Sequence, residues 1–251
     1  MALAMAGAAM VTFAGEANAA TYLQVTNVSN VYSNAPTADL YKTSTPTEQV
    51  TNARLTPQTL TGYYTNAPGT TFNLFAYCVD IFETSGTGKF EVVSAASQYT
   101  TAKYNVLAQL ISAQGSQVSK THDAAVQLAI WEVINETMNV YDIDKISTST
   151  WDWNRWKYVD TSAPQFWAED ISDSSVKALA ESYIADAVKN AGKATPNLTL
   201  YVAKNDGKQD MLFWTTAVPA VPEPATWGMM LIGMGVVGYS MRRRKVDVSF
   251  A

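Results

Sequence analysis

The chain has 251 residues, of which 22 are acidic and 17 basic, giving a formal net charge of −5. An acidic surface does not neutralise phosphates, so the composition argues against a protein that binds nucleic acid. A single His and a single Cys exclude zinc sites that need several such ligands, and we expect neither a metal ion nor a cofactor.

The first 19 residues predict export. They are mostly small and apolar and end in Ala17-Asn18-Ala19, which is typical of a secretory signal peptide cleaved after Ala19. Such a peptide opens with a basic region, and no Lys or Arg precedes this apolar run. We therefore expect the natural reading frame to begin further upstream. A buried N-terminal helix is the alternative interpretation.

Residues 20–218 follow the signal peptide, and their number suits one well-packed domain. Apolar and polar residues alternate over several segments of the first half, which predicts strands. The segments are Thr21 to Tyr32, Thr59 to Tyr64, Thr71 to Phe82 and Phe90 to Ser94. A Gly-containing stretch between the last two indicates a turn, so we expect these two to be neighbouring strands of a hairpin.

The only cysteine lies on the third of these strands. Cys78 is flanked by Tyr77 and Val79, and Asp80 follows. Strand alternation places Cys78 and Asp80 on one face and Tyr77 and Val79 on the other. An exported protein normally pairs its cysteines, so an unpaired one is either a free thiol buried in the core or bonded to something other than sulfur.

Helical spacing of apolar residues replaces the alternation in the middle of the chain. It predicts helices over Tyr99 to Ala113, Asp123 to Glu136 and Ser172 to Asn190, with Asp123 as a candidate cap of the second. Strands return at Leu198 to Ala203 and Met211 to Thr216. We therefore expect an α+β fold, rich in β-structure and sandwich-like or barrel-like, with an inserted helical part.

A glutamine lies on the apolar face of the second predicted helix. Gln127 shares that face with Ile130, Trp131 and Ile134, three, four and seven residues later. Burying an amide without partners costs about 1 to 3 kcal/mol. This side chain must therefore be hydrogen-bonded, for instance to strand backbone, or be chemically converted.

The cysteine and glutamine segments together resemble the thioester domains of bacterial surface adhesins. That family's pattern is an aromatic residue or Leu, then Cys and an apolar residue, followed later by apolar-Gln-x-x-apolar-Trp. The first part is filled by Tyr77-Cys78-Val79 and the second by Val126-Gln127-Leu128-Ala129-Ile130-Trp131. The resemblance implies a β-rich thioester-domain fold and a covalent bond between the Cys78 sulfur and the Gln127 acyl carbon.

A thioester forms when the sulfur attacks the amide and expels ammonia, and it then reacts with an amine such as a protein Lys or a polyamine. The resemblance implies this single covalent attachment to an amine-bearing partner and no enzymatic turnover. Tyr77, Val79, Ile130 and Trp131 are expected to exclude water from the reacting groups. Because the thiolate is the nucleophile, a base is needed, and Asp80 and His122 are candidates.

Two other interpretations stay open. Cys78, His122 and an acid such as Asp80 could form a cysteine hydrolase or transglutaminase. Alternatively, Cys78 is inert and the protein binds a matrix exopolysaccharide without covalent chemistry. The aromatic residues that could stack against sugars there are Trp151, Trp153, Trp156, Phe166 and Trp167, although we expect half of them to be buried. Residues 139–170 could form a lid over the reactive pair.

The C-terminal segment, residues 219–251, has three parts in a fixed order. Pro222-Glu223-Pro224 with Trp227 is followed by a short apolar stretch, Met229 to Met241, and then by Arg242, Arg243, Arg244 and Lys245. The apolar stretch is at the low limit for spanning a bilayer, and the cations predict a cytoplasmic C-terminal end. This order resembles the PEP-CTERM sorting signal of Gram-negative bacteria. The resemblance implies processing by an exosortase, transient anchoring in the inner membrane and a final place on the cell surface or in the extracellular matrix.

Overall fold

The computed structural model describes residues 21–42, 48–113, 119–136, 141, 143, 148–152, 157–162, 166–195 and 197–216. The chain divides into two compact units, Met1–Thr216 and Ala217–Ala251, and every described residue belongs to the first. The predicted signal peptide and the predicted sorting tail lie outside the described residues.

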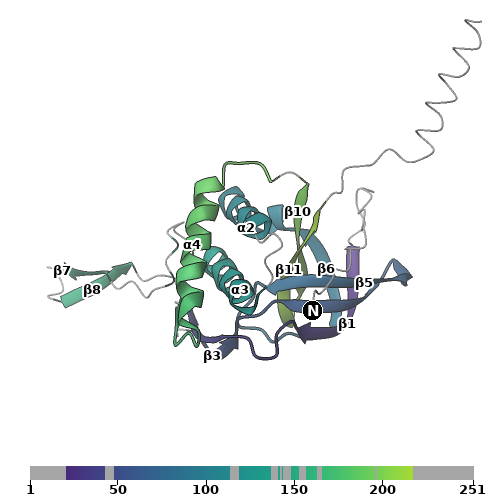
Figure 1. The fold of residues 1–251 in the computed structure, drawn as a ribbon, viewed down its shortest axis with the longest axis horizontal. Helices are drawn as coiled ribbons and strands as arrows, with labels where there is room; N and C mark the ends of the chain where they lie inside the picture. Colours follow the sequence, from purple (N-terminus) through teal and green to yellow (C-terminus); the bar gives the residue numbers. More distant parts are fainter. Residues whose placement is uncertain are drawn as a thin grey trace, which may run out of the picture. The chain divides into compact units, whose positions relative to one another are not determined.

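Six of the described strands close into a barrel in the order β1, β4, β5, β11, β10 and β6 (Figure 1). They are β1 (Thr21–Asn30), β4 (Gln58–Tyr64), β5 (Ala67–Cys78), β6 (Gly88–Ser94), β10 (Leu198–Asn205) and β11 (Lys208–Thr216). Strict alternation of buried and half-buried residues along β4 matches the period of a strand with one face in the core. The barrel therefore joins segments from the two ends of the described chain.

The predicted hairpin between the cysteine strand and the strand at Phe90 is wrong. β5 pairs with β4 and β11, whereas β6 pairs with β1 and β10. The turn expected between β5 and β6 is instead a connection between strands that are not neighbours in the barrel. Alternation in the sequence sets which face of a strand is buried, and it leaves the partner strand open.

The inserted helical part consists of α1 (Ala95–Gln98), α2 (Thr101–Ala113), α3 (Lys120–Asn135) and, later in the chain, α4 (Ser174–Asn190). Figure 1 shows α3 between α4 and the barrel, and α3 packs on α2, α4 and β5. Every residue from His122 to Val133 is buried. A helix enclosed on all sides can carry polar side chains only where they find partners.

The predicted cap of α3 is corrected. The helix begins three residues before Asp123, and Ser119 is its N-cap, with the side chain accepting a hydrogen bond from the backbone N–H of His122 at 3.2 Å. Asp123 is thereby free for another role. The cap of α4 is Asp173, whose carboxylate accepts from the backbone N–H of Ser175 at 3.1 Å.

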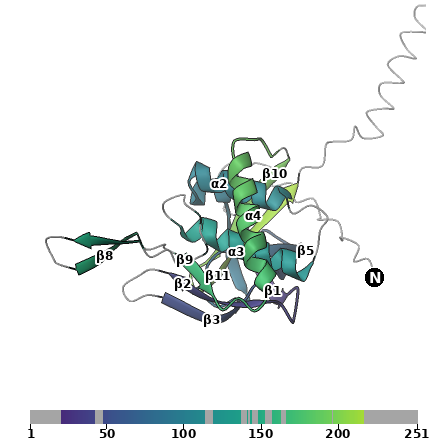
Figure 2. The ribbon, with the colours of Figure 1, turned by 60° about the vertical axis from the view of Figure 1, so that its left-hand side comes forward.

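A second sheet was not anticipated from the sequence. It has the order β3 (Glu48–Arg54), β2 (Thr37–Lys42) and β9 (Phe166–Glu169), and a separate hairpin joins β7 (Thr148–Asp152) to β8 (Lys157–Ser162). Figure 2 shows this sheet alongside the helices. The end of the predicted lid is therefore built into a sheet, because β9 pairs with β2 from Phe166 to Glu169.

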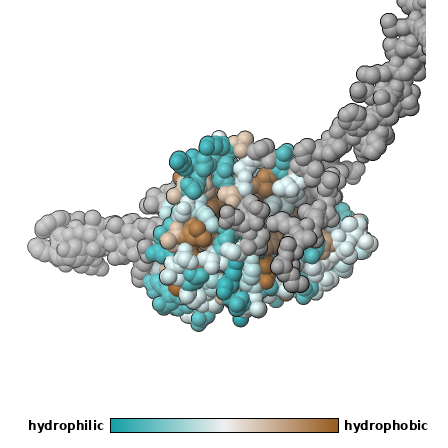
Figure 3. Space-filling model, viewed as in Figure 1, coloured by the Kyte–Doolittle hydropathy of each residue, from teal (hydrophilic) through white to brown (hydrophobic). Residues whose placement is uncertain are grey.

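The structure confirms the expected α+β class, with a barrel-like β-part and an inserted helical part. Hydrophobic residues form small, separate patches on the face drawn in Figure 3. Among the described residues, Val188 is the one large hydrophobic side chain that is exposed. In the same part of the chain, no helix is long and apolar enough to cross a membrane; the apolar stretch of the tail lies elsewhere.

Candidate functional site

Cys78 is the last residue of β5, and on the β4 side its backbone N–H and C=O have no described strand as a partner. Directly after β5, the backbone N–H of Val79 donates to the carbonyl of Asp210 in β11 at 3.0 Å. Because successive residues of a strand direct their N–H and C=O groups to opposite sides, the peptide groups of Cys78 face the β4 side. β4 begins only at Gln58, opposite Ala76. A strand partner for Cys78 is therefore missing at this point of the barrel.

The side chain of Gln127 takes that place. Its Oε1 accepts a hydrogen bond from the backbone N–H of Cys78 at 3.1 Å, and its Nε2 donates to the backbone carbonyl of Cys78 at 2.8 Å. Gln127 is fully buried. The amide thus completes the ladder as a further strand residue would, and both buried polar groups are satisfied at once. The two residues singled out in the sequence lie side by side.

The Cys78 side chain is also enclosed, with 4% of its surface exposed, and its thiol forms no disulfide. Burial raises the pKa of the thiol from its ordinary 9.0 to about 12, because the charged thiolate is disfavoured away from water. At neutral pH the sulfur therefore stays protonated, which makes it a weak nucleophile and a poor catalytic cysteine.

The four predicted surrounding residues are all buried: Tyr77, Val79, Ile130 and Trp131. The ring of Tyr77 lies within an aromatic cluster with Phe75 and Trp214, at centroid distances of 5.6 and 6.2 Å. The indole nitrogen of Trp131 finds no hydrogen-bond acceptor among the described residues. Their burial is compatible with the predicted exclusion of water from the Cys78–Gln127 contact, which stays a prediction.

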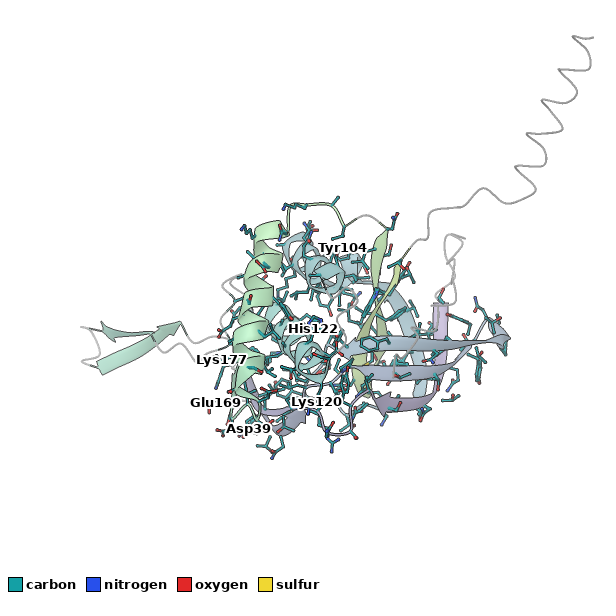
Figure 4. The ribbon with its side chains drawn as sticks, viewed as in Figure 1. Asp39, Tyr104, Lys120, His122, Glu169 and Lys177 are labelled. Carbon is teal, nitrogen blue, oxygen red and sulfur yellow. The ribbon has the colours of Figure 1, made fainter. Side chains whose placement is uncertain are left out.

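Among the described residues, the hydrogen bonds of the two predicted bases go to partners other than Cys78. Asp80 accepts a hydrogen bond from the backbone N–H of Phe82 at 3.1 Å. The His122 ring nitrogen Nδ1 lies 2.6 Å from the Tyr183 hydroxyl on α4, and Figure 4 places His122 on that side of α3. Within the described part of the chain, no hydrogen bond joins either side chain to Cys78.

A different acid, Asp123, lies near the pair, and it is not the cap of α3 that the sequence predicts. Asp123 is 1% exposed and sits one helical turn before Gln127. Its carboxylate accepts hydrogen bonds from the hydroxyl of Tyr32 at 2.7 Å and from that of Tyr77, the neighbour of Cys78, at 3.3 Å. Burial, followed by the charge of Asp123, holds the pKa of Tyr77 well above its usual range. The four-residue spacing of Asp123 and Gln127 on one helix face was the signal available in the sequence.

The aromatic residues considered as a sugar-binding surface do not form one in the described part of the chain. Phe166 and Trp167 are buried on β9, and the Trp167 ring stacks on Tyr41 at a centroid distance of 5.1 Å. Of the three other tryptophans, the side chain of Trp151 and the whole of Trp153 and Trp156 lie outside the described residues.

Comparison with known families identifies the tail. Residues 220–245 match the model of the PEP-CTERM protein-sorting motif, and this range contains Pro222, Glu223, Pro224 and Trp227 together with the basic residues up to Lys245. The predicted sorting signal is confirmed, and it marks the chain as an exported, cell-surface-directed protein subject to exosortase processing. The curated proteins contain no match.

Among solved structures, the chain is similar to the N-terminal domain of the Streptococcus pyogenes pilus tip adhesin Cpa. The two are 13% identical, the match covers 76% of this chain and 100% of that one, and the TM-score is 0.35.

Proposed function

We propose that residues 20–218 form the binding domain of an exported surface protein, and that this domain attaches covalently to a partner through a thioester between Cys78 and Gln127. The observation that carries the proposal is the pair of hydrogen bonds that fixes the Gln127 amide against the backbone of Cys78. The Gln127 side chain and the backbone of Cys78, 49 positions apart in sequence, are thereby held together in a buried site. Such fixed proximity replaces the encounter of two separate reactants.

The chemistry follows from the same contacts. The Cys78 sulfur attacks the acyl carbon of Gln127, the carbon–nitrogen bond breaks, and Nε2 leaves as ammonia with the thiol proton. Negative charge develops on Oε1 during the attack, and the backbone N–H of Cys78 already donates to that oxygen, as an oxyanion-binding group does. An amine of the partner then attacks the carbonyl carbon, the carbon–sulfur bond breaks, and an amide and a free thiol remain.

Burial protects this stored electrophile. Water attacking the thioester would convert Gln127 to Glu and waste it, so the enclosed surround of Tyr77, Ile130 and Trp131 is a requirement of the chemistry. The amine-bearing partner, a protein Lys or a polyamine, reacts once per molecule. We also propose transient anchoring in the inner membrane of a Gram-negative bacterium before the tail is processed.

A second candidate function is supported by the same hydrogen bonds. If the amide only completes the strand ladder, Cys78 is an inert core residue and the protein binds its partner, such as a matrix polysaccharide, without a covalent bond. A cysteine hydrolase has less support. Among the described residues, His122 and Asp80 form their hydrogen bonds with groups other than Cys78, and burial raises the pKa of the thiol.

Intact-mass measurement of the folded protein separates the two candidates. The thioester form is lighter than the sequence mass by one ammonia, and the Cys78→Ala and Gln127→Ala variants should each show the unmodified mass. Incubation with methylamine should then add the mass of one methylamine to the wild-type protein alone, because the product is the N-methylamide of Gln127. A wild-type protein of unmodified mass, with a thiol that reacts fully once the protein is unfolded, would refute the thioester.

A further inference from the structure

A cavity of about 250 Å³ is lined by residues from the ends of α1, α3 and β2, from β10 and β11, and from the segment that follows β5. Its polar lining consists of Lys42, Asp80, Gln98, Asn135, Lys204 and Asp210, and Tyr99 and apolar side chains complete the wall. The residues come from segments spread over most of the described chain. Neither Cys78 nor Gln127 lines it, so the cavity is separate from the proposed reactive pair.

The two carboxylates of the cavity are held in place by main-chain groups. One oxygen of Asp80 accepts from the backbone N–H of Phe82 at 3.1 Å, and one oxygen of Asp210 accepts from the backbone N–H of Asn205 at 2.9 Å. Among the described residues, the second oxygen of each has no hydrogen-bond donor. Two fixed acceptors are therefore available for a ligand, and little conformational entropy is lost when they bind.

Hydrogen-bond donors lie in the same cavity. The Lys204 ammonium donates to Oε1 of Gln98 at 3.2 Å and retains further N–H groups. The hydroxyl of Tyr99 has no partner among the described residues, and burial raises the pKa of Tyr99, so this hydroxyl keeps its proton. Lys42 lies over the ring of Phe82, with 5.9 Å between the ammonium and the ring centroid.

Charge and size restrict what can bind. The lining combines two lysines with two aspartates, so their formal charges cancel. A charged ligand would be attracted by one pair of like charges and repelled by the other, so the lining favours a neutral ligand. The volume corresponds to about eight water molecules and is below that of pockets for drug-sized ligands. A small, neutral ligand that both donates and accepts hydrogen bonds meets these conditions.

We infer that this cavity binds one ring of a neutral saccharide. Neighbouring hydroxyls of a sugar donate to the free carboxylate oxygens of Asp80 and Asp210 and accept from Lys204 and Tyr99, while the C–H groups contact the apolar wall of Val79, Ile134 and Val202. The inference goes beyond the proposed covalent attachment and does not depend on it. An exported, surface-directed protein meets such sugars as free molecules or as units of a polymer.

The test is ligand-observed NMR on the folded protein with glucose, galactose and mannose, and with dextran as a polymeric probe. Saturable binding of at least one probe is expected. Asp210→Asn keeps the acceptor for Asn205 and should weaken that binding about tenfold or more, since a charged hydrogen-bond acceptor is lost. Gln98→Ala removes the acceptor that holds the Lys204 ammonium in place, so this second variant should also weaken binding. Asp186→Asn, on the exposed side of α4, is the matched charge control and should bind as the wild type does.

The arms of this test have distinct outcomes. If a hexose binds, the ligand is a free sugar. If dextran alone binds, the ligand is a sugar unit within a polymer. Both results support the inference. An absence of saturable binding to all four probes would overturn it. The same holds if Asp210→Asn and Gln98→Ala, shown to be folded by their melting temperatures, bind as tightly as Asp186→Asn. Glycine is added to the same NMR experiment as a zwitterionic probe. If it bound more strongly than every sugar, the cavity would be assigned to a zwitterion and the inference would be overturned.

Discussion

Asp123 links α3 to β5 through its hydrogen bond with Tyr77. Its carboxylate is buried and accepts the hydroxyls of Tyr32 and Tyr77, one turn before Gln127 on α3. Because Tyr77 precedes Cys78 on β5, its hydrogen bond to Asp123 fixes the position of α3 along β5. The hydrogen bonds of the Gln127 amide to Cys78 require that same relative position.

Replacing Asp123 with Ala should therefore destabilise the protein by about 1 to 3 kcal/mol, since the buried hydroxyl of Tyr77 loses its acceptor. Urea denaturation of the variant measures the loss. The exposed Asp186→Ala serves as the control, with an expected change within about 0.5 kcal/mol. The Asp123→Ala protein should also lose a smaller fraction of ammonia than the wild type. Equal stability of the two variants would contradict the role assigned to Asp123.

The thiol of Cys78 gives the protein a pH dependence that distinguishes its free and bonded forms. The pKa of the folded thiol is raised to about 12 from an ordinary 9.0. A raised pKa contributes stability that is fully present below pH 9.0 and is lost as the pH rises towards 12, because the unfolded chain releases the proton first. A thioester has no thiol proton and lacks this dependence.

Gln127→Ala keeps the thiol free, so its stability should fall faster above pH 9.0 than that of the double variant Cys78→Ala/Gln127→Ala. The difference should approach about 1.4 kcal/mol per pH unit. Urea denaturation at several alkaline pH values gives both curves, and the tyrosines with raised pKa values contribute equally to each. Parallel curves would mean that the buried thiol is not perturbed.

At the scale of single residues, the sequence predicted that Cys78 and Gln127 lie close together, and it missed the hydrogen-bond partners of the nearby acids and of His122. A polar residue on an apolar helix face requires a partner, and this requirement is visible without a structure. The direction of a carboxylate is not visible in that way. Asp80, Asp123 and His122 were therefore given roles by proximity in sequence, whereas their real partners, such as Tyr32 and Tyr183, are distant along the chain.

Secondary-structure elements were predicted as far as periodicity reaches. The helices from Thr101, Lys120 and Ser174 and the barrel strands were expected, with shifted ends. The sheet of β2, β3 and β9 was missed, because β3 is half-exposed or exposed throughout and has no apolar face to produce a pattern. The pairing of β5 with β11, on which the site depends, joins residues far apart in sequence and has no local signal.

The backbones of β1 and β4 approach each other closely where the two strands pair at Gly62. A Cβ atom added at Gly62 would lie 1.9 Å from the backbone carbonyl oxygen of Gln24 and 2.9 Å from the ring of Phe72. The carbonyl belongs to the neighbouring strand and cannot move without disrupting the ladder. Gly62 is therefore required by the close approach of two strands.

Gly62→Ala should destabilise the barrel by about 1 to 3 kcal/mol or more, as overpacking of a core does. Gly69→Ala, on β5, is the matched control, because an added Cβ there meets nothing within 4 Å. Thermal unfolding followed by circular dichroism compares the two. A Gly62→Ala protein that melts with the Gly69→Ala protein would show that β1 and β4 separate more easily than their pairing indicates.

At the scale of the whole molecule, the proposed reactive pair and the sorting tail lie in different units of the chain. The Cys78–Gln127 contact lies wholly within the unit Met1–Thr216, and the sorting motif at residues 220–245 lies within the unit Ala217–Ala251. We therefore expect the proposed thioester to form and persist independently of tail processing.

Mass spectrometry of the protein recovered from outside the cell should accordingly show a C-terminus near Pro222-Glu223-Pro224, without the basic residues from Arg242 to Lys245. The same molecules should still lack one ammonia. Replacing Glu223 with Ala in the sorting motif should leave the tail attached and the protein in the membrane fraction, because the cations hold that end on the cytoplasmic side. The ammonia deficit should be unchanged in this variant. Secreted protein that still ends at Ala251 would contradict processing, whereas a deficit that disappears with the tail would contradict the independence of the two units.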